Sequence, residues 1–428
     1  MRGHRRFSHS GFRRMWRPAM VAGMLGATAL LAAHPAAARN DEVFKVRAAI
    51  SLPNLQKIQS FDISFVDPFL GGYFLADRTN ATVDGVYVKT NQLTEQLKAN
   101  FAGVGPTSDT SGPNGIITVH SNKNTQFFLW AGDYGNGSNG GTGGLVKVID
   151  LSNGSLVATI ATGGVARADE LCLDPKDNVV LVANDAEPFT ATGGGPYVTF
   201  IDSTNYKVLG QIVMNGQNGT PRATNGIEQC QYSRRTGMFY LNIPEVNGPG
   251  NDTAPGAVLV IDPTSRSIVN TFPLDHSQCE GPQGMAIGPQ NQILIGCNDP
   301  NKDVPSTVII NERNGKTLAV VPNEDGSDQV WYNPGDGHYF LGESGGANPQ
   351  HLGIIDALTG VSDISPQTGI KGGGTSHSVA ADPITNKVFV PIAATAGAGV
   401  CSSVGGDDSV GCIAVFTANR PRHEVEGE

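Results

Sequence analysis

Residues 170–184 read ELCLDPKDNVVLVAN: a short apolar strand, a turn at Asp174 and Pro175, and a second apolar strand. Asp and Pro favour tight turns, and Val-rich runs bounded by such turns are typical of strands. The arrangement returns about every 40 to 60 residues along the chain. The seven copies begin at Phe61, Gly115, Glu170, Ile227, Gln283, Gln329 and His377.

A second pair of strands follows most copies. Val146–Asp150 ends in Ile-Asp and precedes the alternating run Ser155–Ile160, and Tyr197–Asp202 precedes Lys207–Ile212 in the same way. Each unit therefore supplies four short strands, and residues 39–428 lack the period of 3.6 residues that marks a helix. This pattern predicts an all-β fold, a seven-bladed β-propeller.

The last unit is incomplete at its C-terminal end. It offers Ile413–Phe416 as a third strand, and we expect Val43–Arg47, near the N-terminus, to supply the fourth. This pairing would close the ring and remove its exposed edges. A six-bladed ring is the alternative, because the unit from Gly115 to Asp150 is the least regular.

The N-terminus has the pattern of a cleaved signal peptide. Six arginines and no acidic residue precede an apolar run, Ala19–Ala33. The small residues Ala36–Ala38 follow that run and suit a cleavage site. We expect residues 1–38 to be removed and residues 39–428 to form a single propeller domain. The run is shorter than the roughly 20 residues of a membrane-spanning helix, so we expect no transmembrane segment after cleavage. The mature protein is then periplasmic or secreted.

The arginines of the expected signal peptide bear on the export route and on the net charge of the mature protein. The pairs Arg5-Arg6 and Arg13-Arg14 leave both Sec and twin-arginine export open. Removing the six arginines from the 29 basic residues leaves 23, against 39 acidic ones, so the net charge falls from −10 to −16. So acidic a protein is not expected to bind nucleic acid.

Six cysteines, all in the mature part, predict disulfides in an oxidising compartment. A metal–thiolate site is the alternative, but no C-x-x-C motif supports it. Many pairings are possible, and the repeat register favours three of them: Cys172 with Cys230, Cys279 with Cys297, and Cys401 with Cys412.

The run Val179–Asn184 and the recurrent Val-x-Val-Ile-Asp, as in Val258–Asp262, resemble YVTN-type β-propeller repeats. The resemblance covers nearly the whole mature chain and implies the propeller fold. It does not imply one function, because such propellers serve as hydrolases, lyases, electron-transfer subunits and binding modules.

The first strand of each blade lines the central channel of a propeller, so the starts of these strands share one mouth. Carboxylates crowded there must be protonated, solvated or neutralised by a cation, and their oxygens suit calcium or another divalent ion. The alternative is that most of them are hydrated rim residues or turn-capping Asp and Asn. The candidate metal ligands are Asp62, Glu170, Asn225, Glu228 and Glu280.

Two segments resemble the gluconolactonase and senescence-marker propellers, which are metal-dependent. Asn225–Ile227 is similar to their Asn-Gly-Ile segment and Glu280–Pro282 to their Glu-Gly-Pro segment, although here the latter lies C-terminal to the former. The resemblance implies a lactone hydrolase in which the ion polarises the carbonyl and Asp328 or His377 acts as base.

Other cofactor and catalytic motifs are present as letters but lack the structural context that they require. Gly135–Gly140 matches the dinucleotide fingerprint and Gly342–Gly346 the nucleophile elbow, but neither opens a helix, so we expect no NAD. The sequence has no C-x-x-C-H and therefore no covalently bound heme of that type. We expect the channel mouth to bind a small ligand, an ion or a protein without catalysis; a calcium-type metal-dependent lactonase is the alternative.

Overall fold

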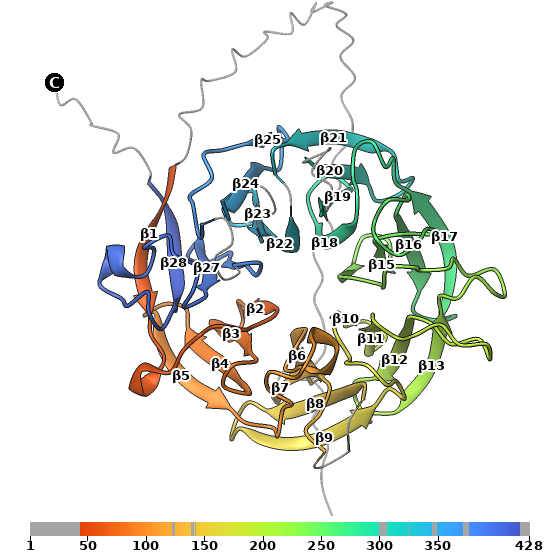
Figure 1. Ribbon diagram of the computed structural model, residues 1–428, viewed down its shortest axis with the longest axis horizontal. Coiled ribbons are helices and arrows are strands. Elements are labelled where there is room, and N and C mark those ends of the chain that lie inside the picture. Colours follow the sequence, from red (N-terminus) through yellow and green to blue (C-terminus); the bar gives the residue numbers. More distant parts are fainter. Residues whose placement is uncertain are drawn as a thin grey trace, which may run out of the picture. The chain divides into compact units, whose positions relative to one another are not determined.

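The computed structural model of the protein is a ring of seven antiparallel sheets with four strands each (Figure 1). The predicted all-β, seven-bladed propeller is confirmed. All described residues fall within one compact unit. None of them belongs to a helix long and apolar enough to cross a membrane. The expected signal peptide, residues 1–38, lies outside the described residues. The structure describes residues 43–121, 125–137, 141, 143–298, 306–324, 326–344, 349–370 and 376–419.

Each of the first six blades is built from consecutive strands that run from the centre of the ring outward (Figure 1). The unit that looked least regular in sequence forms a complete second blade. Blades one to four consist of β2 (Ser64–Asp67), β3 (Gly72–Asp77), β4 (Thr82–Tyr87) and β5 (Gln92–Leu97); β6 (Ile116–His120), β7 (Phe127–Asp133), β8 (Leu145–Asp150) and β9 (Ser155–Ala161); β10 (Leu171–Asp174), β11 (Val179–Asn184), β12 (Tyr197–Asp202) and β13 (Val208–Val213); β14 (Cys230–Ser233), β15 (Met238–Ile243), β16 (Ala257–Asp262) and β17 (Ser267–Pro273).

The seventh blade joins the two ends of the described chain. β1 pairs antiparallel with β28, and their register runs from Val43 opposite Asn419 to Ile50 opposite Ile413. The expected closure by an N-terminal strand is therefore present. The remaining blades consist of β18 (Pro282–Ile287), β19 (Gln292–Cys297), β20 (Ser306–Asn311) and β21 (Thr317–Pro322); β22 (Ser327–Asn333), β23 (His338–Glu343), β24 (Leu352–Asp356) and β25 (Val361–Ser362); β26 (Ala380–Asp382), β27 (Lys387–Ile392), β28 (Cys412–Asn419) and β1 (Val43–Ile50). Short 3-10 turns occur at Pro53–Leu55, Ser108–Thr110 and Ser402–Val404.

The core lies between the blades, because each sheet packs both faces against its neighbours. The middle strand β11, with the sequence VVLVAN, is buried at every position. The outermost strand β17 is exposed at most positions. Trp130, on β7, is fully buried in this core. Burial thus explains why inner and middle strands are continuously apolar in sequence.

Three disulfides connect the cysteine pairs that the repeat register favours, and no described cysteine is free. The first bridge ties the inner strand of blade three to that of blade four, while the other two close segments within blades five and seven. The bridges join Cys172 to Cys230, Cys279 to Cys297, and Cys401 to Cys412.

Candidate functional site

Three titratable side chains from blades one, six and seven converge where the inner strands begin. The Nε2 atom of His377 lies 3.6 Å from Oδ1 of Asp62 and 3.7 Å from Oδ2 of Asp328. One ligand atom of each residue lies within 4.8 Å of those of the other two. The ring of Phe61 stacks on His377 with the centroids 5.0 Å apart and fixes its plane. This mouth cluster, Asp62, Asp328 and His377, combines both candidate catalytic residues with one candidate metal ligand.

Arg78 forms a buried ion pair with Asp62 that the sequence analysis did not anticipate. Its guanidinium also donates to Oδ1 of Asn114, from Nε at 3.0 Å and from Nη2 at 2.8 Å. Asn114 in turn donates to the carbonyl of Ala168 at 2.9 Å. Burial would raise the pKa of Asp62, but the charge of Arg78, the contact with His377 and the charge of Arg167 together lower it to about 2. Asp62 is therefore a carboxylate at neutral pH.

A second arginine, Arg167, forms ion pairs with three more carboxylates of the mouth. Its Nη2 lies 2.5 Å from Asp169 and 3.3 Å from Asp185, and its Nη1 lies 3.2 Å from Asp109. Protonation, solvation and a bound cation were the three expected ways to relieve the crowding of these acids. The structure adds a fourth way, which is internal arginines. The sequence feature that could have predicted this contact was the basic residue Arg167, two positions before the Asp169-Glu170 pair.

Three acids of the mouth form no ion pair with either of these arginines. Burial raises the pKa of Glu170 well above its ordinary value, and the charges of Asp169 and Asp62 raise it further. Burial likewise raises the pKa of Glu228, with Asp328 adding to the effect. Burial also raises the pKa of Asp328, although His377 opposes the shift. The mouth therefore holds more carboxyl groups than its two arginines neutralise.

The other two candidate metal ligands lie in a separate group. Asn225 donates from Nδ2 to Oδ1 of Asp252 at 2.7 Å. Glu280 accepts an ion pair from Nε2 of His276 at 3.1 Å. The Cβ that a side chain at Gly281 would carry meets Cγ of Asp252 at 3.0 Å, so the two pairs are neighbours. Neither Asn225 nor Glu280 belongs to the mouth cluster.

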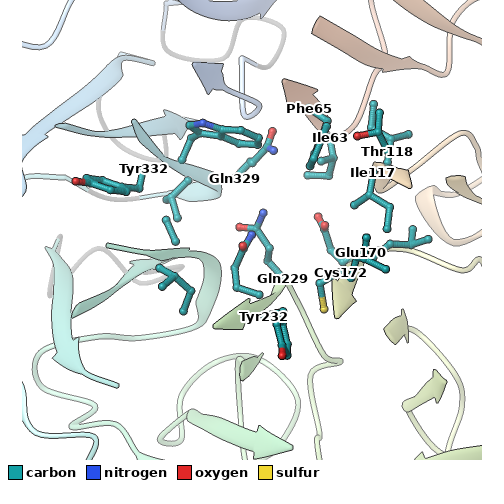
Figure 2. A pocket seen from close by; sticks show the side chains of 18 of the residues that line it. Ile63, Phe65, Ile117, Thr118, Glu170, Cys172, Gln229, Tyr232, Gln329 and Tyr332 are labelled. Atoms are coloured by element: carbon teal, nitrogen blue, oxygen red, sulfur yellow. The ribbon is translucent and has the colours of Figure 1, made fainter. Parts of the chain in front are cut away.

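A cavity of about 310 Å³ occupies the channel between the inner strands (Figure 2). Polar residues contribute to its lining at both ends, among them Glu170, Gln229 and Gln329 and, farther along the strands, Gln231 and Arg234. Figure 2 shows the side chains of Glu170, Gln229 and Gln329 extending inward from different blades. Most of the remaining wall is apolar and includes Ile63, Ile117 and Trp331.

The two motifs rejected in sequence lie partly outside the described residues. Gly135 follows strand β7, and residues 138–140 of its segment are not described. Gly342 lies in β23, and the Oγ of Ser344 donates to the carbonyl of Gly326 at 2.9 Å. Ser344 is therefore held by a backbone group rather than by a histidine among the described contacts.

Comparison with known proteins supports the fold and gives no further assignment. No protein-family model matches the sequence, and no curated protein matches it. A chain in the crystal structure of the mitotic checkpoint complex is similar in structure, with a TM-score of 0.52 and 13% sequence identity. The match covers 94% of this chain and 99% of that one. It establishes the fold alone. The likeness to YVTN-type repeats stays a resemblance in sequence.

Proposed function

We propose that the protein is an exported binding propeller that takes up a divalent cation at the mouth of its channel. The observation that carries this proposal is the mouth cluster, in which Asp62, Asp328 and His377 each direct a ligand atom to within 4.8 Å of the others. Three separate blades position these side chains, so the site exists before the ion arrives. Such preorganisation lowers the free-energy cost of binding.

The electrostatics of the mouth support a cation. Glu170, Glu228 and Asp328 are buried beside other acids, which raises the pKa of each carboxyl. A positive ion among them would reduce this repulsion. Calcium fits the carboxylate oxygens, whereas the imidazole of His377 is a donor that Mn²⁺ and Zn²⁺ accept more readily. All three ions therefore belong in the test.

Binding without chemistry is preferred over lactone hydrolysis for a structural reason. A hydrolase of the lactonase type would need a base beside its metal ligands. Asp328 and His377, the two candidate bases, would both be occupied as ligands of the ion. Asn225 and Glu280, which carry the resemblance to lactonases, bond instead to Asp252 and His276.

Export is supported by the cysteines. All six form disulfides, which persist in oxidising compartments and are rare in the cytosol. We therefore propose that the protein acts in the periplasm or outside the cell.

The proposal is tested by isothermal titration calorimetry of the purified mature protein with Ca²⁺, Mn²⁺ and Zn²⁺. We expect one ion per chain, and Asp328→Asn should weaken binding by at least about tenfold, because it removes a ligand. Asp109→Asn is the matched control: it removes the same charge at the mouth from a half-exposed residue outside the cluster. Absence of binding for all three ions, or equal effects of the two variants, would contradict the proposal. Hydrolysis of a lactone panel with and without chelator tests the alternative.

A further inference from the structure

One buried carboxyl group in the channel has no partner of its own. Glu170 is only 6% exposed. Its side chain forms no hydrogen bond or ion pair with any residue that the structure describes, unlike Asp62 and Asp169, which pair with arginines. Figure 2 shows the carboxyl pointing into the channel cavity. A buried carboxyl group without a partner is costly, so a group that fills this position would be strongly favoured.

We propose that the cavity binds a small organic cation, an amine with a short apolar body, and that Glu170 is its counter-ion. The volume of about 310 Å³ lies at the lower end of small-molecule sites, so the ligand is small. This inference goes beyond the metal ion proposed for the mouth cluster and does not depend on it.

The side chains that line the cavity favour a ligand with an apolar body. Ile63, Ile117 and Ile287 line it with aliphatic side chains, and the indole of Trp331 adds an aromatic surface. Trp331 is held in place by an edge-to-face contact with Phe65, with the ring centroids 5.5 Å apart. An aliphatic chain packed here would leave water, and this transfer of apolar surface favours binding.

The charges around the cavity specify the sign and the orientation of the ligand. Asp169, Asp62 and Asp328 act on Glu170 with negative charge and Arg167 opposes them with positive charge; because the acids outnumber the arginine, the position attracts a cation and repels an anion. Gln229 precedes β14, at the Glu170 end of the cavity, whereas the exposed Arg234 follows β14, at the opposite end. An ammonium group therefore belongs beside Glu170, with the apolar chain directed away from the mouth.

Three probes of equal chain length separate charge from hydrophobicity: hexylamine, 1-hexanol and hexanoate. Calorimetric titration of the mature protein, with and without EDTA, should show hexylamine binding at least about tenfold more tightly than the other two. Glu170→Gln keeps the shape but cannot form a carboxylate beside the ammonium group, so it should abolish the preference for the amine. Glu95→Gln, a half-buried acid on the outermost strand β5, is the matched control and should change nothing.

Equal binding of hexylamine and 1-hexanol by the unmodified protein would overturn the inference, and this comparison needs no variant. Failure of all three probes to bind would overturn it as well, as would a Glu170→Gln variant that remains folded and behaves like Glu95→Gln. Amine binding without metal binding would refute only the proposed function. Metal binding without amine binding would refute only this inference.

Discussion

Gln329 links three blades near the point where the ring closes, so its removal should destabilise the whole propeller. The side chain is 1% exposed. Its Oε1 accepts from the backbone N–H of Ser64 at 3.1 Å, from the backbone N–H of Val379 at 3.1 Å and from Oγ of Ser378 at 2.7 Å. Its Nε2 donates to the carbonyl of Ser64 at 2.7 Å. The amide thus caps the inner edge of β2, which has no further strand beside it.

Gln329→Ala would leave three backbone groups buried without these partners, the N–H and C=O of Ser64 and the N–H of Val379. Ser378 keeps a contact, since its Oγ also donates to Oγ of Ser64 at 2.9 Å. At about 1 to 1.5 kcal/mol for each unsatisfied group, the free energy of unfolding should fall by about 3 to 5 kcal/mol. Urea unfolding followed by circular dichroism measures this change.

Gln231→Ala is the matched control for this prediction. Gln231 lies on the inner strand β14 and also lines the channel, but it forms no side-chain hydrogen bond with another described residue. Its loss should cost less than about 1 kcal/mol, as for most partly exposed substitutions. If the two variants unfold within about 1 kcal/mol of each other, then Gln329 does not hold the blades together as described.

Two further predictions concern stability. Because burial raises the pKa of Glu170, the folded protein holds that proton more tightly than the unfolded chain does, and its stability should fall as the pH rises above the ordinary glutamate value. Glu170→Gln should flatten that slope in thermal melts taken between acidic and neutral pH; an unchanged slope would contradict the assigned burial. Replacing Cys172 and Cys230, 58 residues apart, by serine should cost about 4 kcal/mol, against about 3 for Cys401 and Cys412, 11 apart. The reverse order in chemical denaturation would rule out loop closure as the cause.

The fold could be predicted from the sequence down to individual strands. The run Val179–Asn184 coincides with β11, and Val43–Arg47 falls within the closing strand β1. These features were predictable because strand alternation and Asp-containing turns are local patterns. Asp174, for example, accepts from the backbone N–H of Lys176 at 2.8 Å inside its own turn. The cysteine pairs followed from the same register.

Which polar residues meet at the mouth could not be predicted from the sequence, because it depends on how the blades pack in three dimensions. Asp62 and His377 are distant in sequence and come together because blade seven closes against blade one. Arg78 and Arg167 lie in loops, whose course no repeat encodes, and each neutralises acids from other segments. Contacts between side chains of different blades depend on the geometry of the closed ring, which a one-dimensional pattern of apolar residues does not specify. The same geometry leaves the carboxyl group of Glu170 without a hydrogen bond or an ion pair among the described residues.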